Sequence, residues 1–175
     1  MQSKYNFPRY TYSDYKNWKE DWELIDCYPL QLLHYSDIKH SRLKTKLIGL
    51  IFDSFELNSS KKCEIYKELD WKINDETVVR PDLMIICGET EGNYLEFPPV
   101  LIIEILSPSS INKDRVIKFD LYREQGVKYY IMIDFTKKTT EVFELIDNYY
   151  KQVKINEFSI SPDCTVIYDF EKIWK

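Results

Sequence analysis

Apolar residues recur at helical spacing in one long segment near the start of the chain. Between positions 38 and 57 they fall three or four residues apart, as on one face of an α-helix. These apolar positions are Leu43, Leu47, Leu50, Ile51, Phe52 and Phe55. A second helix is expected over 110–125, with Ser109 or Ser110 as its N-cap and Gly126 as its end. A short helix or turn is expected within 13–21.

Short apolar runs rich in β-branched residues predict the strands. They lie near 63–73, 78–87, 100–107, 129–134, 140–145 and 149–153. A hairpin is expected where 22–26 and 30–34 flank the sequence Cys27-Tyr28-Pro29, and one or two helical turns are expected over 169–174. An early helix, a run of strands, a helix and more strands predict an α/β or α+β fold. We expect a single domain over 1–175, with one central mixed β-sheet flanked by helices.

The composition fits one compact domain of 175 residues. Hydrophobic residues make up 44% and charged residues 30%, which excludes a disordered or membrane-embedded chain. No run approaches the roughly 20 apolar residues of a membrane span, and no signal peptide is expected at the N-terminus. The four cysteines form no CxxC pair, so a zinc site is not expected, and Cys87 is interpreted as a reduced core thiol. These features predict a cytoplasmic protein.

The charge pattern leaves a nucleic-acid substrate open. A net charge of −5 argues against nonspecific coating of nucleic acid, but not against a nuclease, whose catalytic carboxylates add negative charge. The segment 39–46 is basic, and its Arg42, Lys44 and Lys46 are candidates for phosphate contacts. A solvated helix face is the preferred interpretation of these three charges.

One carboxylate stands inside the most apolar run of the chain. Glu104 lies within the sequence Val-Leu-Ile-Ile-Glu-Ile-Leu, which is typical of a strand buried on both faces. An ionised carboxylate there costs several kcal/mol unless a metal or a cation satisfies it. The candidates for that partnership are a metal ion, Asp82 and Lys118. Two carboxylates on neighbouring strands with a lysine nearby are typical of a metal-dependent phosphodiesterase.

Four motifs in order give the chain a resemblance to a known family. They are Trp-Glu-Leu-Ile-Asp-Cys at 22–27, Arg-Pro-Asp-Leu at 80–83, Ile-Glu-Ile-Leu-Ser-Pro-Ser at 103–109, and a helix with Asp114, Lys118 and Tyr122 followed by Gly126-Val127. Together they resemble the Uma-two family of restriction endonucleases, within the PD-(D/E)xK nuclease superfamily. The resemblance covers about 12–174.

The resemblance implies a restriction-endonuclease-like fold and a DNA endonuclease that uses Mg²⁺ or Mn²⁺. By it, Asp82 and Glu104 are metal ligands, Lys118 is the catalytic lysine, and Glu23 is an accessory catalytic residue and metal ligand. The chain departs from the superfamily at Leu106, which stands where the E-x-K lysine would be. The family shares that departure and supplies the lysine from the following helix. Cys27 stands in place of the family's usual glycine, so the hairpin turn is expected to differ.

Each site residue also has a structural alternative. Glu104 could form an ion pair with Arg80 or Arg115, and Asp82 could shape the turn after Pro81. Lys118 could pair with Asp114 four residues earlier on a helix surface, and Glu23 could be an ordinary strand carboxylate. The whole protein could then be an inactive binding or interaction module with a nuclease fold. A homodimer would supply the two active sites that cutting a duplex needs, although no residue pattern indicates one.

Overall fold

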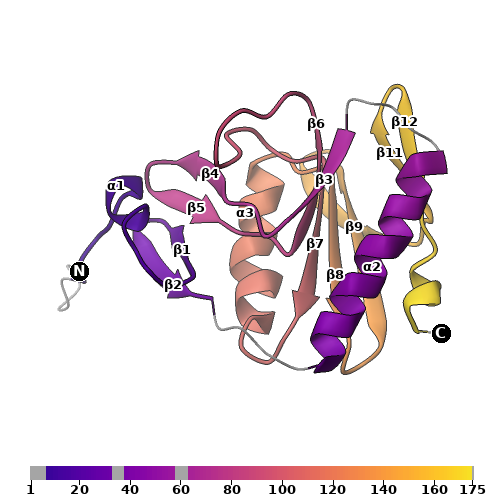
Figure 1. Ribbon diagram of the computed structural model, residues 1–175, viewed down its shortest axis with the longest axis horizontal. Helices are drawn as coiled ribbons and strands as arrows, with labels where there is room; N and C mark the ends of the chain where they lie inside the picture. Colours follow the sequence, from indigo (N-terminus) through magenta and orange to yellow (C-terminus); the bar gives the residue numbers. More distant parts are fainter. Residues whose placement is uncertain (1–6, 33–37, 58–62, 175) are drawn as a thin grey trace.

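The computed structural model describes residues 7–32, 38–57 and 63–174 and arranges them as three sheets with helices packed around them (Figure 1). A four-stranded sheet has the order β2-β1-β5-β4, a six-stranded sheet has the order β10-β9-β8-β7-β6-β3, and β11 pairs with β12. The elements in chain order are α1 (Tyr12–Tyr15), β1 (Trp22–Ile25), β2 (Tyr28–Gln31), α2 (Ile38–Leu57), β3 (Cys63–Lys67), β4 (Trp71–Asn74), β5 (Thr77–Val79), β6 (Leu83–Cys87), β7 (Leu101–Leu106), the π-helix η1 (Lys113–Lys118), α3 (Phe119–Glu124), β8 (Tyr129–Asp134), β9 (Thr139–Ile146), β10 (Tyr149–Val153), β11 (Glu157–Ser161), β12 (Cys164–Ile167) and the 3-10 helix η2 (Phe170–Trp174).

The six-stranded sheet is mixed, and one crossover accounts for its parallel pair. β7 runs parallel to β8 from the pair Leu101–Tyr129 to the pair Leu106–Asp134, and the other neighbouring strands in the sheet are antiparallel. Parallel neighbours need a long connection, which η1 and α3 supply between β7 and β8. β7 and β8 are buried along their whole length, as their continuous apolar sequences predict.

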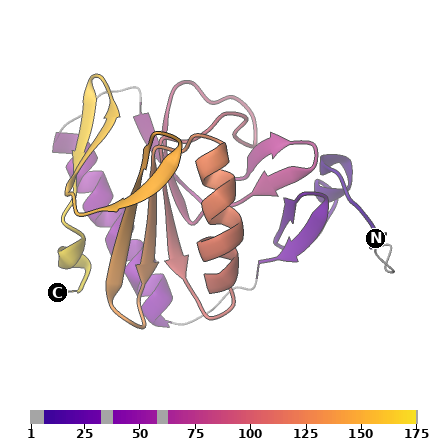
Figure 2. The same cartoon turned by 180° about the vertical axis from the view of Figure 1, so that it is seen from behind.

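The two faces of this sheet carry separate apolar cores. Alternate side chains of β7 point to opposite faces, so Ile103 and Ile105 join one core, while Ile102 and Leu106 join the other. The first core also contains residues of α2, of the β11–β12 hairpin and of η2. The second contains residues of α3 and of the small four-stranded sheet. Figure 1 shows α2 in front of the sheet, and Figure 2, from behind, shows α3 on the other face.

α2 has the bounds and the buried face that its apolar spacing predicts. Leu43, Leu47 and Ile51 follow one another at intervals of four residues and are all buried against the sheet. Phe52, which the same pattern includes, is exposed. The side chain of Phe55 lies outside the described set. None of the helices in the described ranges combines the length and apolar character that a membrane crossing requires.

Two of the expected strands are each divided in the structure. The run 63–73 becomes β3 and β4, and the run 78–87 becomes β5 and β6, with the two halves of each run in different sheets. Glu68, between β3 and β4, has a φ of 51°, a left-handed conformation that interrupts an extended chain. Pro81, between β5 and β6, has no N–H to donate to a strand ladder. The six-stranded sheet is the central mixed sheet that the sequence predicts, and the divided strands add a second, smaller sheet. The hairpin of β11 and β12 was not predicted.

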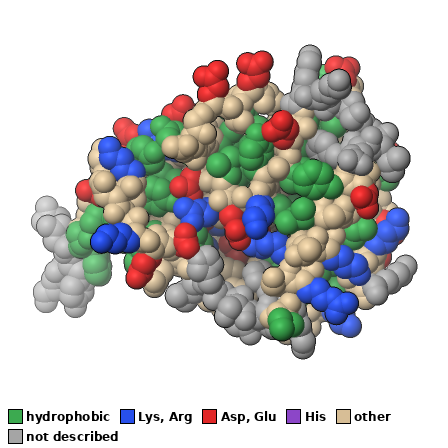
Figure 3. All heavy atoms as spheres, viewed as in Figure 1, with side chains coloured by type: hydrophobic (Ala, Val, Ile, Leu, Met, Phe, Trp, Pro, Cys, Tyr) green, Lys and Arg blue, Asp and Glu red, His purple; other side chains and the backbone are tan. Residues whose placement is uncertain are grey.

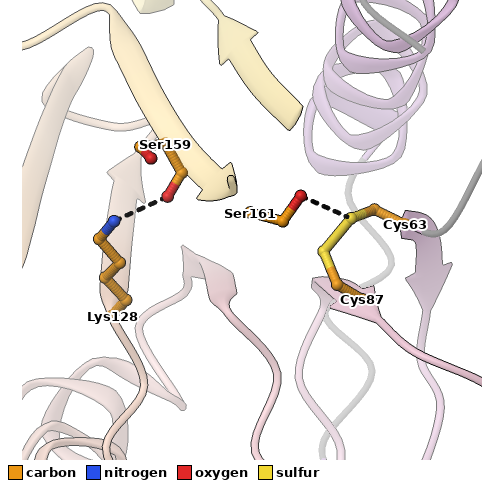
Figure 4. Close-up of a disulfide and its surroundings, with 5 residues drawn as sticks. All are labelled: Cys63, Cys87, Lys128, Ser159 and Ser161. Atoms are coloured by element: carbon orange, nitrogen blue, oxygen red, sulfur yellow. Dashed lines mark hydrogen bonds between the residues drawn. A yellow bond between two sulfur atoms is a disulfide. The ribbon is translucent and has the colours of Figure 1, made fainter. Parts of the chain in front are cut away.

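A disulfide joins two neighbouring strands at one edge of the large sheet. Cys63 on the edge strand β3 lies directly opposite Cys87 on β6, and their sulfur atoms are bonded (Figure 4). The hydroxyl of Ser161 lies 4.0 Å from the sulfur of Cys63. The expectation that Cys87 is a reduced core thiol is therefore wrong, because the strand register places a second cysteine beside it. Cysteine usage accordingly lends no support to a reducing compartment.

Candidate active site

Asp82 and Glu104 face each other where β6 and β7 separate. The antiparallel ladder pairs Leu83 with Ile103 and ends there, so the next residues along the two strands are Asp82 and Glu104. Beyond that point, side chains take over the hydrogen bonds of the ladder. The backbone N–H of Ile105 donates to Oδ2 of Asp82 over 2.8 Å, and the N–H of Asp82 donates to Oε2 of Glu104 over 3.3 Å. The expected proximity of the two carboxylates is thus present in the structure.

Glu104 is held by two donors from the helix that follows its strand. Lys118 donates to Oε1 of Glu104 over 2.8 Å, and the hydroxyl of Tyr122 donates to the same oxygen over 2.9 Å. All three side chains are buried. The structural partner of Glu104 is therefore Lys118, whereas Arg80 and Arg115 have other acidic partners, which are Asp21, Asp70 and Glu141. Tyr122 was not predicted as a site residue, although its position four residues after Lys118 places it on the same face of the helix.

The π-helix η1 explains how two lysines reach one buried carboxylate. In an α-helix, residues five positions apart point about 140° away from each other. A π-helix bonds residue i to residue i+5, so Lys113 and Lys118 lie one above the other. Both ammonium groups contact Glu23, Lys118 at 2.6 Å from Oε1 and Lys113 on Oε2. Segments of π-helix are frequent at functional sites, and Lys113 is a site residue that the sequence did not reveal.

Glu23 comes from β1 of the small sheet and is completely buried. Its Oε1 also accepts the backbone N–H of Arg80 over 2.8 Å, so both carboxylate oxygens have donors. The β1–β2 hairpin that presents it turns at Asp26 and Cys27, with φ values of 52° and 71°. A two-residue turn with both φ values positive suits the twist of a hairpin. Cys27 thus adopts the left-handed conformation that a glycine would take more easily.

A third lysine contacts Asp82 from the opposite side of the large sheet. Lys44 of α2 lies 2.7 Å from Oδ1 of Asp82 and 2.7 Å from Oε1 of Glu68. Lys46, two residues later, points elsewhere and donates to the carbonyl of Ile173. Arg42 is exposed. The basic segment therefore does not act as one solvated face, because Lys44 belongs to the carboxylate cluster.

Acidic groups outnumber basic groups in this cluster. Three ammonium groups are shared by four carboxylates, those of Glu23, Asp82, Glu104 and Asp114, and one of the three also binds Glu68. Figure 3 shows acidic and basic side chains side by side near the middle of this face, between the small sheet and α2. An excess of negative charge in a partly buried cluster favours the binding of a further cation or the uptake of a proton.

The pKa shifts differ between Glu104 and Glu23, which both bind Lys118. Burial raises the pKa of Glu104 to about 8, and Lys118 offsets this only in part because Asp114 and Asp82 add negative charge. Burial also tends to raise the pKa of Glu23, but Lys118 and Lys113 together hold it below the usual value. Burial tends to lower the pKa of Lys118, but the carboxylates of Glu104 and Glu23 hold it well above the usual value. Of these two carboxylates, Glu104 is therefore the less compensated.

The donor chemistry at Asp82 and Glu104 suits a hard divalent cation. Within the described residues, no group of three or more His, Cys, Asp and Glu side chains is arranged to enclose a metal. Mg²⁺ nevertheless keeps several waters and is often held by one or two carboxylates. Asp82 is 19% exposed and already holds one cation, the ammonium group of Lys44. Asp82 and Glu104 therefore fit the metal that the sequence predicts, whereas Glu23 is completely buried and paired with two ammonium groups.

Comparison with known proteins agrees with this fold. A solved structure titled "Crystal structure of a putative nuclease belonging to DUF820 from Anabaena variabilis ATCC 29413" superimposes with a TM-score of 0.72. The two sequences are 16% identical, and the match covers 94% of this chain and 97% of that chain. The similarity shows a shared fold, so the predicted restriction-endonuclease-like α+β class is confirmed. No curated protein sequence matches the chain.

The family assignment is direct. The model of the family described as "Uma2: Putative restriction endonuclease" matches residues 11–171. The chain therefore belongs to this family, as the four sequence motifs indicated. The description of the family supports a nuclease. The particular roles of Asp82, Glu104, Lys118 and Glu23 stay predictions.

Proposed function

We propose that the protein is a metal-dependent endonuclease that hydrolyses phosphodiester bonds of DNA. The observation that carries this proposal is the meeting of Asp82 and Glu104 at the end of the β6–β7 ladder, each in contact with a lysine, in a chain of this family. Asp82 and Glu104 would hold Mg²⁺ or Mn²⁺, which when bound activates water and neutralises charge on the scissile phosphate.

The roles of the other predicted residues follow from their contacts. Lys118 would act on the anionic transition state, from a position fixed by Glu104 and Glu23. Glu23 would serve the site by holding Lys118 and Lys113 rather than by binding the metal, because it is completely buried and already paired with two ammonium groups. A homodimer would bring two such sites to a duplex, and light scattering of the purified protein would test it.

A cleavage assay tests the proposed activity. Supercoiled plasmid, linear duplex DNA and RNA would be incubated with the protein in Mg²⁺, in Mn²⁺ and in EDTA. We expect metal-dependent nicking or cutting of DNA, and loss of that activity in Asp82→Asn and Glu104→Gln. Asp120→Asn, which changes an exposed carboxylate on α3, is the matched control and should cleave like wild type. Equal cleavage by Asp82→Asn, or cleavage in EDTA, would disprove the proposed mechanism.

Lys118→Met separates the proposed chemistry from binding. If Lys118 acts on the transition state, the cleavage rate of this variant should fall by about 10² or more while its affinity for DNA stays near wild type. The assay should be run well below the melting temperature of the variant, because the loss of a buried lysine lowers the stability of the fold. An unchanged cleavage rate would exclude Lys118 from the chemistry.

The burial of Lys118 favours one alternative function. Its side chain is only 1% exposed and already bonded to two carboxylates, which suits a structural ion-pair network in an inactive nuclease-fold module. Such a module would bind DNA or a protein without cleaving any phosphodiester. Binding of duplex DNA in a gel-shift assay, with no cleavage in any metal, would favour the alternative.

A further inference from the structure

Two of the three lysines in the cluster contact the proposed metal ligands, and they differ in their access to a substrate. Lys118 is 1% exposed and lies behind Glu104, whereas the side chain of Lys44 is 15% exposed and contacts Asp82, which is itself 19% exposed. A phosphate group of a nucleic acid must approach the carboxylate cluster from solvent. The lysine on the solvent side of the proposed metal ligands is therefore Lys44.

The contacts of Lys44 allow it to leave Asp82 without disturbing the site. Oδ2 of Asp82 is fixed by the backbone N–H of Ile105, so the carboxylate keeps its place when Oδ1 gives up the lysine. Glu68, the second partner of Lys44, stays next to Asp82, because its backbone N–H donates to the carbonyl of Asp82 over 3.3 Å. Lys44 can thus remain on Glu68 while Oδ1 of Asp82 is released.

We propose that Lys44 is a further catalytic residue of this nuclease. In the metal-free protein it is the counter-ion of Asp82. When that carboxylate takes up a divalent ion, Lys44 exchanges its bond to Oδ1 for a contact with the phosphate to be cleaved. The contribution is electrostatic, since no covalent bond or proton transfer of Lys44 is involved. This inference rests on the proposed function for the phosphate contact, but the exchange at Asp82 can be measured without any substrate.

Metal affinity without DNA is the first test. An ammonium group bonded to Asp82 competes with the metal, so Lys44→Met should bind Mn²⁺ about tenfold more tightly than wild type, as measured by calorimetry. Lys44→Arg keeps the competing charge and should stay near wild type. Arg42→Met removes the same charge from an exposed position of the same helix and should also stay near wild type. If Arg42→Met gains as much Mn²⁺ affinity as Lys44→Met, the effect comes from the change in net charge alone, and the proposed exchange is wrong.

A double-mutant cycle makes the test independent of any single variant. Glu68→Gln removes the second partner of Lys44, which should then hold Asp82 more tightly and weaken Mn²⁺ binding. In the Lys44→Met background the same Glu68→Gln change should have little effect, because the competitor is absent. If Glu68→Gln weakens Mn²⁺ binding equally in both backgrounds, Glu68 acts through its own charge and the exchange is wrong.

Binding of a 20-base-pair DNA duplex is the test of the phosphate contact. In Ca²⁺, Lys44→Met should lower the slope of log affinity against log salt by about 0.9, which corresponds to one lost phosphate contact. In EDTA the slope should not change, because Lys44 is then bound to Asp82. In Mn²⁺ the cleavage rate of Lys44→Met should fall about 10²-fold below wild type, and Lys44→Arg should recover part of that loss.

The possible failures are distinguishable. A Lys44→Met protein that binds Mn²⁺ no more tightly than wild type overturns the exchange, whatever the activity. Wild-type cleavage that persists in Lys44→Met overturns the catalytic role and leaves the proposed nuclease standing. If wild type cleaves no nucleic acid in any metal, the proposed nuclease and the catalytic role of Lys44 both fail, and Mn²⁺ affinity alone decides the exchange at Asp82.

Discussion

The ammonium group of Lys118 lies 2.8 Å from Oε1 of Glu104, and the side chains of both residues are almost completely buried. The E-x-K pattern would place a lysine on the same strand, two residues after the glutamate. Here Leu106 has that position and fills the apolar core, while Lys118 reaches the glutamate from the following helix. The ammonium group beside Glu104 can thus come from the following helix instead of from the strand position that Leu106 has here.

The metal-free protein should lose stability as the pH rises from about 5 to 8. The pKa of Glu104 is about 8 in the folded protein and near 4.5 in an unfolded chain, so between these values the folded state holds the extra proton. Stability then falls with rising pH, by up to about 1.4 kcal/mol per pH unit from this group. Urea unfolding in EDTA at pH 5, 6, 7 and 8 measures the slope. Glu104→Gln should flatten it, and an identical slope in the variant would contradict the assignment to Glu104.

Metal should reverse the effect of the same substitution. In EDTA at pH 8, Glu104→Gln should be neutral or stabilising, because it removes one charge from an acidic excess while Lys118 keeps Glu23. In Mn²⁺ at about 100 times its dissociation constant, wild type should gain about 2.7 kcal/mol and the variant much less. Thermal melts in EDTA and in Mn²⁺ decide the matter. A loss of about 3–5 kcal/mol in the variant under both conditions would indicate a purely structural ion pair.

Removal of the buried lysine should be costly, and removal of its partner as well should restore stability. Lys118→Met leaves three buried carboxylates, those of Glu23, Glu104 and Asp114, with less compensation, which should cost about 3–5 kcal/mol. In the double variant Lys118→Met, Glu104→Gln the uncompensated charge is gone, so much of that loss should return. Lys128→Met, at a surface lysine that donates to the carbonyl of Ser159 (Figure 4), should cost less than about 0.5 kcal/mol. Chemical denaturation of these three variants and of Glu104→Gln gives the comparison, and additive effects of the two single substitutions would refute the coupling.

Reduction of the disulfide should weaken the edge of the large sheet. Cys63 and Cys87 are 24 positions apart, and closing a loop of that size stabilises a fold by about 3 kcal/mol in the chain-entropy model. A reducing agent should therefore lower the melting temperature of wild type, but not that of a Cys63→Ser, Cys87→Ser variant. Alkylation of the denatured, unreduced protein should label two cysteines, Cys27 and Cys164. Labelling of all four would show that the bond does not form.

The sequence predicted the pairing of Asp82 with Glu104 because strand register is a local matter. A proline before Asp82 marks the start of one strand, and the apolar residues around Glu104 mark the next. Two consecutive antiparallel strands then bring the two carboxylates together. The bounds of α2 could also be predicted, because its apolar residues recur at helical spacing over twenty residues.

The rest of the site depends on packing between distant elements, which no local pattern records. Lys44 follows Leu43, which lies on the buried face of α2. The apolar pattern of the helix does not tell which side chain of the sheet Lys44 contacts. The partnership of Lys113 with Glu23 joins residues 90 positions apart and depends on a π-helix. The disulfide was missed because the expected strand 63–73 was not paired with the strand that contains Cys87.

The π-helix also ties the length of this helix to its hydrogen-bonding pattern. Lys113 and Lys118 are five positions apart, and both contact Glu23 from the π-helical segment. With α-helical bonding at the same length they would point about 140° apart, and Glu23 would lose one of its two ammonium partners. With one residue deleted between them they would stand four positions apart, which an α-helix places on one face. A single-residue deletion inside this segment is therefore expected to coincide with a change from π-helix to α-helix.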